Sequence, residues 1–273
     1  MQLPGLKGKT VLITGGSRGI GRAIALRCAQ DGANVAIAAK TTEAHPALPG
    51  TIYSVAEEIR AAGGNALPIK MNIRREEEVL SAVDAVVKEF GGIDILVNNA
   101  SAISPTGLLD TPLRKYDLLL SINTRGTYAM TQACIPHLRK ASNPHVLTLS
   151  PPIQTTGHWY GRHLAYCISK FGMSMVTLGV AEEFAADGIA ANSLWPRTLI
   201  ATDAVRVFFE SEIAGSRKPE MMSDAAYFIV TSDSRKTTGN CFIDEDVMRL
   251  HGIGNFDAYA LVPGHPLTPD ILI

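Results

Sequence analysis

A tyrosine and a lysine four residues apart are the side chains of this 273-residue chain best suited to proton transfer. Tyr166 and Lys170, in the run AYCISK, would lie one helical turn apart on the same helix face. A phenol is unreactive near neutral pH because its ordinary pKa is ~10, but a neighbouring cation favours the phenolate and lowers that pKa. Such a tyrosine can give a proton to a carbonyl oxygen or take one from an alcohol. The pair indicates an acid/base centre, although two half-exposed polar residues of an ordinary helix have the same spacing.

A glycine-rich turn near the N-terminus is the second candidate site. The run KTVLITGGSRGIGRAIALRCAQ, residues 9–30, passes from a short apolar segment through this turn into a helical pattern. Glycine allows positive φ and lets a ligand approach the backbone closely. The helix that follows directs free N–H groups and its positive dipole end towards the turn, which attracts a phosphate. Glycine clusters also mark plain turns, but the position of Gly15, Gly19 and Gly21 between a strand and a helix favours a dinucleotide site.

Short apolar segments alternate with helical patterns along most of the chain. After residues 11–13, the expected strands are 34–39, 65–71, 93–97, 146–149, 189–195 and 241–243. The expected helices after the glycine turn include 52–62, 75–90, 112–140 and 165–186. Parallel strands that are covered on both faces are apolar throughout, as these segments are. The alternation predicts an α/β fold: a single-domain, Rossmann-type, doubly wound parallel sheet of about seven strands with helices on both faces.

No repeat, low-complexity tract or linker divides the chain, so residues 1–273 are expected to form one domain. Pro46 and Pro49 predict a loop after the second strand. Residues 198–219 lack strong periodicity and suggest a mobile lid. Residues 244–273, rich in glycine and proline, are expected to form an extended C-terminal arm packed on the body or on a neighbouring subunit.

Composition excludes several functional classes. With 46% hydrophobic residues and a formal net charge of -1, the chain has no basic field for nucleic acid or an anionic membrane. No run approaches the ~20 apolar residues of a membrane span, and the N-terminus lacks a signal-peptide core, so a soluble, cytoplasmic protein is expected. His158 and His163 share a loop without a carboxylate or cysteine to complete a metal site. Buried thiols of a reducing compartment best explain the scattered cysteines, which are Cys28, Cys134, Cys167 and Cys241.

Three motifs together resemble the short-chain dehydrogenase/reductase family. The glycine turn has the family's spacing T-G-x-x-x-G-x-G, beginning at Thr14. The pair Tyr166 and Lys170 matches Y-x-x-x-K, and the run NNAS resembles N-N-A-G. The resemblance covers about residues 6–243. It implies the fold predicted above, a nicotinamide cofactor, a small-molecule substrate and a homodimer or homotetramer.

The resemblance also implies roles for individual side chains. Tyr166 would act as acid/base, and Lys170 would in addition hold the nicotinamide ribose. Asn123, in SINTRGTY, matches the family asparagine that kinks its helix and organises a water chain to the lysine; capping of a helix break is the alternative. The expected catalytic residues are Tyr166, Lys170 and Asn123. The residues expected to contact the cofactor are Gly15, Ser17, Arg18, Gly19, Ile20, Gly21, Lys40, Asn72, Asn99, Tyr166, Lys170 and Thr198.

The end of the second strand predicts which dinucleotide binds. NAD enzymes of this architecture usually have Asp or Glu there, which binds the ribose hydroxyls. Here the strand ends with Ala38, Ala39 and Lys40, and Arg18 in the glycine turn would face the same ribose. Two cations suit a 2′-phosphate, so NADP(H) is expected, although Lys40 alone is compatible with a solvated strand end. Asn72, after the third strand, offers a donor and an acceptor to adenine.

The chain departs from the family at the catalytic serine. The family's serine stands about thirteen residues before the tyrosine, which points to Ile153, and neither Ile153 nor the two prolines before it carries a hydroxyl. Losing such a donor typically lowers the rate by about 10²–10³. Ser150 lies three residues too early. Other possible donors in the same loop are Thr155, Thr156 and His158.

Two further departures affect loops that would flank the cofactor. Ser101 stands in place of the last glycine of N-N-A-G, and the run WPRT after the sixth strand replaces the usual Pro-Gly. Thr198 or Thr202 could contact the carboxamide or the pyrophosphate, although a loop threonine is by default a turn residue.

Two functions from different classes remain open. The first is an NADP(H)-dependent oxidoreductase that interconverts a carbonyl and a secondary alcohol on an apolar or lipid-like substrate. Trp159, Trp195, Phe208 and Phe209 would line its pocket, although core packing explains these aromatic residues equally well. The second is a catalytically weak or inactive NADP(H)-binding protein that serves as a redox sensor or scaffold.

Overall fold

One parallel sheet organises the part of the chain that the computed structural model describes, which is residues 5–45, 48 and 50–272. Its seven strands have the order β3-β2-β1-β4-β5-β6-β7, and every neighbouring pair is parallel. Pro46, Pro49 and Ile273, on which two of the predictions partly rest, lie outside the described residues. The strands are β1 (Thr10–Thr14), β2 (Asn34–Ala39), β3 (Asn65–Lys70), β4 (Ile95–Asn98), β5 (His145–Thr148), β6 (Ala190–Trp195) and β7 (Cys241–Ile243). This architecture confirms the predicted doubly wound sheet.

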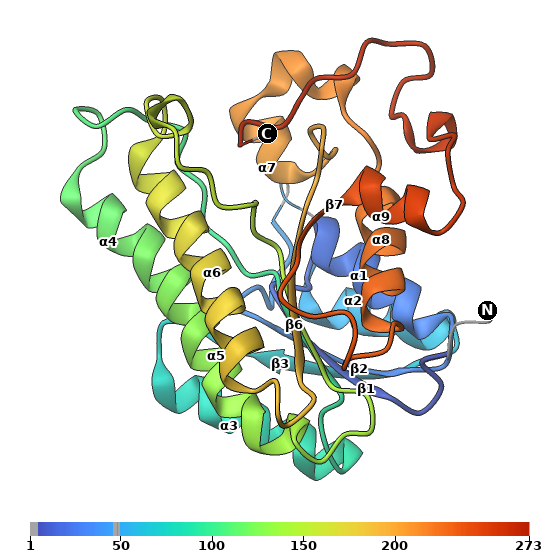
Figure 1. Cartoon of the computed structure of the whole chain (residues 1–273). Helices are drawn as coiled ribbons and strands as arrows, with labels where there is room; N and C mark the ends of the chain where they lie inside the picture. Colours follow the sequence, from blue (N-terminus) through green and yellow to red (C-terminus); the bar gives the residue numbers. More distant parts are fainter. Residues whose placement is uncertain (1–4, 46–47, 49, 273) are drawn as a thin grey trace.

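Helices cover both faces of the sheet. In the described part these are α1 (Gly19–Ala29), α2 (Ile52–Ala61), α3 (Glu76–Phe90), α4 (Leu113–Ile122), α5 (Thr124–Leu138), α6 (Leu164–Glu183), α7 (Asp203–Phe208), α8 (Glu220–Val230) and α9 (Asp244–Leu250). Figure 1 shows α1, α2 and α8 on one side and α3, α5 and α6 on the other. Each side has its own buried apolar cluster against the sheet. Strands enclosed in this way must be apolar on both faces, which is why β1, TVLIT, is buried at every position.

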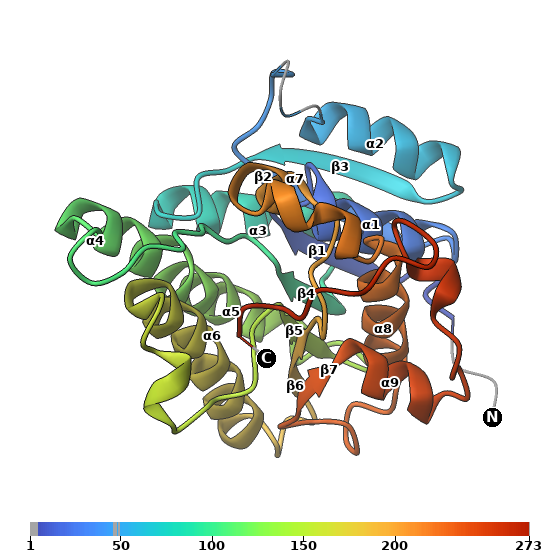
Figure 2. The same cartoon turned by 90° about the horizontal axis from the view of Figure 1, so that it is seen from above.

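The strand order indicates where on the sheet a ligand would bind. The chain turns from β1 outwards to β2 and β3, and then returns to β4 on the other side of β1. Loops that leave neighbouring strands in opposite directions open a crevice at the carboxyl ends of those strands, where ligands of such sheets bind. Figure 2 shows α7 above the sheet near β1 and β2, on the path of the chain after β6. The glycine turn, the loop after β4 and the start of α6 therefore face one another.

Three predicted segments differ from the structure. The helix expected over residues 112–140 is two helices, α4 and α5, which meet at Asn123. Residues 198–219 contain α7 and a 3-10 helix, η2 (Glu210–Gly215), and the segment is held at both ends by Ala201 and Arg217 through backbone hydrogen bonds. Whether this segment moves stays a prediction.

The expected C-terminal arm is not extended over its whole length. Residues 244–250 form α9, and a 3-10 helix, η3 (Asp257–Tyr259), follows. Three acidic residues in the first turn of α9 stabilise the helix, because their charges interact favourably with the positive end of its dipole. Val247 and Met248 of α9 are buried in the same apolar cluster as residues of α8. The stretch DEDVMRL contains neither glycine nor proline. The glycines and prolines on which the extended arm was predicted all follow this stretch, so the composition of the whole segment concealed a short helix at its start.

A buried histidine in the sheet makes the fold sensitive to acid. His145 in β5 is 1% exposed, its Nε2 lies 3.1 Å from the Ser232 carbonyl, and Nδ1 has no partner in the described part of the chain. Burial lowers the pKa of His145 from 6.5 to about 4, against the smaller opposing effects of the Ser232 carbonyl and Asp233. Because the folded-state pKa lies below the unfolded one, His145 stabilises the fold above pH 6.5, and this stability is lost as pH falls towards 4.

His145→Gln is therefore expected to reduce the acid sensitivity of folding. Gln keeps an N–H donor for the Ser232 carbonyl and does not titrate. Between about pH 7 and pH 5 the wild type should lose about 2 kcal/mol more unfolding free energy than the variant, as measured by urea denaturation. His251→Gln, at an exposed position, is the matched control. Equal pH dependence in the wild type and His145→Gln would contradict the prediction.

Candidate active site

One cavity at the carboxyl ends of the strands collects most of the predicted site residues. Its volume is about 610 Å³, and it extends from the glycine turn and the end of β2 to the first turns of α6. The predicted residues that line it are Gly15, Ser17, Arg18, Gly19, Ile20, Lys40, Asn72, Asn99, Tyr166 and Lys170. Gly21, Asn123 and Thr198 do not line it. The glycine turn and the acid/base pair, Tyr166 and Lys170, thus line the same cavity.

The glycine turn has the backbone that a close ligand needs. Gly15 and Gly19 have φ of 70° and 55°, in the left-handed region that glycine adopts readily. A Cβ on Gly15 would lie 2.9 Å from Ala100 Cα, so only glycine fits between the two loops. Arg18 is the N-cap of α1 and has no side-chain cap bond, so the first N–H groups of α1 point to the cavity edge without a capping side chain. This cradle fits the pyrophosphate of a dinucleotide.

The turn is tied to the loop after β4 by two side chains. Asn99 Nδ2 donates to the carbonyl oxygens of Thr14 and Gly15, at 2.9 and 3.0 Å. Thr14 Oγ1 accepts hydrogen bonds from the backbone N–H groups of Asn99 and Ala100, at 3.1 and 3.0 Å. Asn99 therefore shapes the turn from the other side of β1, as well as lining the cavity.

Two cations meet at the end of β2. Arg18 Nη2 donates to Thr41 Oγ1 at 3.0 Å, Thr41 follows Lys40 in the chain, and both cations line the cavity. Asp203 at the start of α7 lies 3.8 Å from Arg18 Nη1. Thr41 and Asp203 line the same part of the cavity and were not among the predicted site residues. Their only sequence signal is adjacency to Lys40 and Thr202.

Asn72 keeps part of its amide available at the end of β3. Its backbone N–H donates to Glu78 at 2.7 Å, and its Oδ1 accepts from the Arg74 N–H at 3.3 Å. Its Nδ2 makes no hydrogen bond with the described residues, so that donor can serve a ligand base.

Tyr166 and Lys170 lie in the first turns of α6, at the inner end of the cavity. Tyr166 is 5% exposed, and its hydroxyl has no hydrogen-bond partner among the described residues. Lys170 is 2% exposed; its Nζ donates to the Leu149 carbonyl and lies 4.8 Å from the centre of the Trp195 ring. The phenol is free to bond a substrate oxygen, and the ammonium is held in place.

The pKa of Tyr166 differs from the sequence-based expectation. Burial raises the pKa of Tyr166 well above its ordinary value, and the Asp270 carboxylate adds to that increase. Burial also lowers the pKa of Lys170 to about 7, while Asp270 opposes this decrease. In the chain alone, desolvation thus outweighs the attraction of the Lys170 cation for a phenolate, and the phenol is the resting form.

Asn123 supports the site from outside the cavity. Its Oδ1 accepts from the Ala102 N–H at 2.7 Å, and its Nδ2 donates to the Ala102 carbonyl and to Ser169 Oγ, both at 2.9 Å. These bonds use every polar position of the amide. Asn123 thus joins the loop after β4 to α6 beside Lys170. It stands at the break between α4 and α5, but its side chain makes no cap hydrogen bond to either helix, so the capping alternative is not supported, and its catalytic role stays a prediction.

The loop after β5 brings no hydroxyl to the cavity. Leu149 lines the cavity from this region, whereas residues 150–158 do not. The Ser150 hydroxyl is fully buried and has no partner in the described part of the chain. Thr155, Thr156 and His158 are exposed. The candidate substitutes for the family serine therefore do not reach the reacting end.

The loop after β6 contributes Thr202 instead of Thr198. Thr198 is buried and pairs with Pro269 of the C-terminal segment, while Thr202 lines the cavity and caps α7 by accepting from the Val205 N–H. The placement of Thr198 among the cofactor contacts is therefore not supported by its position. Tertiary pairing with the distant C-terminus decides between the two threonines.

Four aromatic residues were predicted to line an apolar pocket, and Trp195 is the one of them that lines this cavity. Trp159, Phe208 and Phe209 do not line it. Other apolar residues that line the cavity include Ile103, Leu118, Ile122 and Leu149. These aliphatic side chains come from the loop after β4, α4 and the end of β5, and none was predicted, since their apolar character alone marks them as core.

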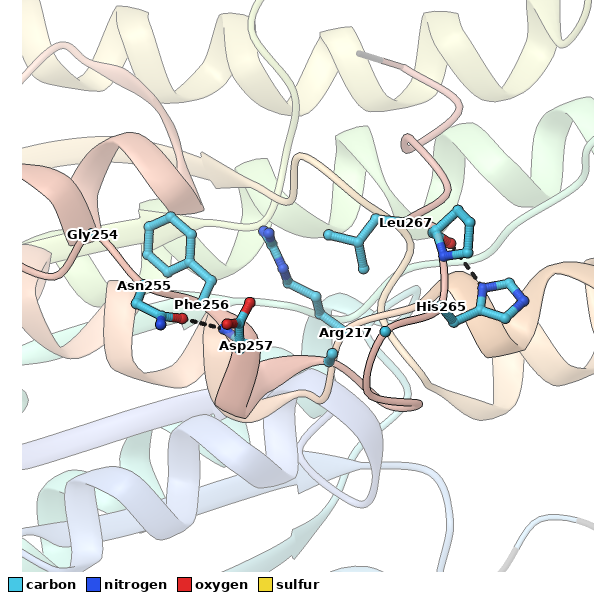
Figure 3. A pocket seen from close by; sticks show the side chains of 10 residues that line it. Arg217, Gly254, Asn255, Phe256, Asp257, His265 and Leu267 are labelled. Carbon is cyan, nitrogen blue, oxygen red and sulfur yellow. Dashed lines mark hydrogen bonds between the residues drawn. The ribbon is translucent and has the colours of Figure 1, made fainter.

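A second cavity, of about 550 Å³, lies between Arg217 and the C-terminal segment (Figure 3). Figure 3 shows the Arg217 guanidinium between Phe256 and Leu267. Arg217 forms an ion pair with Glu245, so its charge is already balanced by a carboxylate. No predicted site residue lines this cavity.

The described residues offer neither a metal site nor a clear membrane span. No group of three or more His, Cys, Asp and Glu side chains among them could hold a metal ion. In the same part of the chain, α6 alone is long and apolar enough to cross a membrane by length and composition, and 56% of that window is buried inside the protein. Core helices meet the same criteria, so this is weak evidence for a span.

Comparisons with known proteins agree with the geometry. A family model described as short chain dehydrogenase matches residues 9–212. The solved structure of a putative dehydrogenase from Xanthomonas campestris is similar, with a TM-score of 0.97 and 51% identity, and the match covers 99% of both chains. The structure of an NADH-dependent reductase, A1-R', complexed with NAD is 26% identical, with a TM-score of 0.72, and covers 87% of this chain and 95% of that one.

The chain therefore belongs to the short-chain dehydrogenase family, as its motifs predict. Within that family it is similar to hydroxysteroid dehydrogenase-like protein 2 from Bos taurus, at 55% identity over 269 residues. The match covers 98% of this chain and 64% of the relative, so the chain spans just under two thirds of that protein's length. The runs TGGSRGIG, NNASAIS, SINTRGTY and NSLWPRT predict this same relative, and the comparison confirms that prediction.

Proposed function

We propose that this protein is an NADP(H)-dependent oxidoreductase that interconverts a carbonyl and a secondary alcohol. The observation that carries the proposal is the single cavity lined at one end by the glycine turn and at the other by Tyr166 and Lys170. A cradle for phosphates and a free buried phenol in one space are the two parts that such a reaction needs. Membership of the family and the NAD-bound relative support a nicotinamide dinucleotide as the cofactor.

The chain's own residues account for the proton. A bound NADPH would supply hydride to the carbonyl carbon. Tyr166, neutral in the buried site, would donate its phenolic proton to the carbonyl oxygen, and the reverse reaction would return it. Lys170, anchored on the Leu149 carbonyl, would stabilise the phenolate that forms, because an adjacent cation favours the charged form. Asn123 holds the loop after β4 against α6 and so fixes the distance across the site.

The substrate is proposed to be apolar or lipid-like. Trp195 and Ile103, which pack in one apolar cluster with Tyr166, line the cavity and give it an apolar surface beside the phenol. The name of the similar relative, hydroxysteroid dehydrogenase-like protein 2, supports the same substrate class. A panel of aliphatic ketones, steroid ketones and the corresponding alcohols, followed by the change in NADPH absorbance, tests the proposal, with Tyr166→Phe as the comparison variant.

Arg18 and Lys40 are expected to select NADPH over NADH. The pair Arg18→Ala/Lys40→Ala should weaken NADPH binding by about thirtyfold to a thousandfold and leave NADH binding almost unchanged, because each of the two charge-assisted bonds to the 2′-phosphate contributes about 1–2 kcal/mol. Isothermal titration of both cofactors measures this difference. Added salt should reduce the preference in the wild type.

A matched control removes two cations elsewhere. Arg139 and Lys140 follow α5 and are exposed, outside the cavity. Arg139→Ala/Lys140→Ala should leave both affinities unchanged. Equal weakening of NADPH and NADH by the Arg18/Lys40 pair would overturn the proposed NADP(H) preference without affecting the proposed reaction.

One observation favours the alternative, an NADP(H)-binding protein with little or no turnover. The loop after β5 presents no hydroxyl to the cavity, so a donor that would polarise the substrate carbonyl beside Tyr166 is missing from residues 150–158. Both hypotheses predict cofactor binding. If the wild type reduces no member of the carbonyl panel faster than Tyr166→Phe does, the sensor or scaffold function replaces the enzymatic one.

Assembly and location complete the proposal. Tyr128 on α5 and Met175 on α6 are 56% and 60% exposed, which supports burial against a second copy in a homodimer or homotetramer. Light scattering of the purified chain tests this.

The proposed location is a reducing compartment such as the cytoplasm. Buried free thiols at Cys28, Cys134 and Cys167 support it, and fractionation of cells tests it.

A further inference from the structure

The C-terminal segment is built into the active-site end of the molecule. The Thr268 carbonyl accepts from the Leu199 N–H at 2.9 Å, and the Asp270 N–H donates to the Arg197 carbonyl at 3.1 Å. Leu272 is fully buried in an apolar cluster with Tyr166 and Trp195.

This path brings a carboxylate to the edge of Trp195. Asp270 Oδ1 accepts a hydrogen bond from Trp195 Nε1 at 2.7 Å and a second from the Leu272 N–H at 3.1 Å. Trp195 lines the cavity, whereas Asp270 does not. The ammonium of Lys170 lies over the face of the same indole, 4.8 Å from its centre. The indole of Trp195 therefore contacts the Asp270 carboxylate at its N–H edge and the Lys170 ammonium on its face.

Charge and geometry reinforce each other in this arrangement. A carboxylate that accepts from the indole N–H fixes the ring plane by a strong, directional bond. A ring fixed in this way presents its negative face to a cation, and that attraction is larger where water is excluded. Lys170 forms no ion pair within 4.0 Å with a described residue. Asp270 is the carboxylate whose charge opposes the effect of burial on the pKa of Lys170.

We propose that Asp270 is a positioning residue of the active site, which through Trp195 keeps the Lys170 ammonium charged and oriented beside Tyr166. Only the catalytic consequence of this arrangement, the support of Tyr166 during proton transfer, rests on the proposed function. The coupling between Asp270, Trp195 and Lys170 is a property of the chain itself. It makes the last residues of the segment part of the site and gives the run WPRT, with its tryptophan, a role beyond packing.

The charges around Asp270 support the coupling. Burial raises the pKa of Asp270 to about 6, while the hydrogen bonds from Leu272 and Trp195 and the Lys170 cation oppose that increase. Tyr166 and Lys170 face it from α6, and Asp244 acts on it from α9. The Arg197 guanidinium is paired with Asp246 and Glu245 and so is not free to replace Lys170. Removing the cation should therefore raise the pKa of Asp270 further.

The first experiment follows the fluorescence of Trp195. The chain has two tryptophans, so Trp159→Phe leaves Trp195 as its single reporter. In cofactor-free Trp159→Phe protein, the emission should change with pH around a midpoint near 6, where Asp270 gains a proton. Adding Asp270→Asn should abolish this transition once Lys170 is also replaced by Met, because Asn keeps the acceptor oxygen and does not titrate, and the Lys170 ammonium over the ring, whose pKa is about 7, no longer contributes. Asp257→Asn, the same change at an exposed residue of the same segment, should retain it.

A second variant separates coupling from local structure. In the Trp159→Phe background, Lys170→Met leaves the C-terminal segment unaltered and should move the midpoint to higher pH, since the cation that favours the Asp270 carboxylate is gone. A midpoint that Lys170→Met leaves in place, or a transition that survives Asp270→Asn in the Lys170→Met protein, would overturn the proposal. Because neither measurement needs a substrate, failure to find turnover would count against the proposed function and not against this coupling.

Cofactor binding gives an independent readout. Without the carboxylate, the pKa of Lys170 should fall, so Asp270→Asn should lose NADP⁺ affinity at a lower pH than the wild type. At about pH 8 we expect a severalfold higher Kd for the variant, and equal Kd values for Asp257→Asn and the wild type. An identical pH dependence of Kd in Asp270→Asn and the wild type would contradict a role of Asp270 in keeping Lys170 charged.

Discussion

Tyr166→Phe is expected to lower kcat/KM for carbonyl reduction by about 10²–10⁴, the usual contribution of general acid catalysis. The substitution removes one oxygen and retains the ring, which packs in the apolar cluster with Trp195 and Leu119. NADPH affinity should change little, because the phosphate cradle lies at the other end of the cavity. Steady-state kinetics on the best substrate of the carbonyl panel, together with a cofactor titration, measure both quantities.

Tyr116→Phe is the matched control for this loss. Tyr116 packs against the same cluster as Tyr166 but does not line the cavity. The control should retain wild-type turnover. If Tyr166→Phe reduced carbonyls as fast as Tyr116→Phe does, the phenol would not be the proton donor and the enzymatic proposal would fail.

Gly21→Ala is expected to damage the cofactor site most severely. A Cβ on Gly21 would lie 2.4 Å from Asn99 Nδ2 and 2.7 Å from the Gly15 carbonyl oxygen, so the side chain that ties the turn to β4 must move. Overpacking of this kind costs about 1–3 kcal/mol of unfolding free energy. Loss of the two Asn99 bonds to the turn should also weaken NADPH binding on the order of tenfold or more. Thermal unfolding with and without NADPH reports both effects.

Gly254→Ala shows what the same substitution does where there is room. Gly254 lies in the C-terminal segment, is exposed, has no positive φ, and an added Cβ would meet no atom within 4 Å. Because alanine has less freedom than glycine in the unfolded chain, Gly254→Ala should stabilise the fold by up to about 1 kcal/mol. Unchanged NADPH affinity in Gly21→Ala would show that the turn does not hold the nucleotide.

The sequence by itself determined the features that depend on neighbours in the chain. The apolar runs that become β1, β2 and β6 must be strands enclosed on both faces, and the glycines at 15 and 19 are required by a backbone with positive φ. The spacing of Tyr166 and Lys170 places both on one helix face. Helix period, strand period and turn chemistry are local properties, so the amino-acid order alone predicts the sheet, the cradle and the acid/base pair.

Only the tertiary structure decided the features that depend on residues far apart in the chain. Thr198 pairs with Pro269 and leaves Thr202 to the cavity, and Asp270 reaches Trp195 across 75 positions. No sequence period records such contacts, since they arise when the C-terminal segment packs back onto the end of β6. The pKa of Tyr166 belongs to the same class, because burial is set by the whole fold and here outweighs the neighbouring cation that the sequence displays.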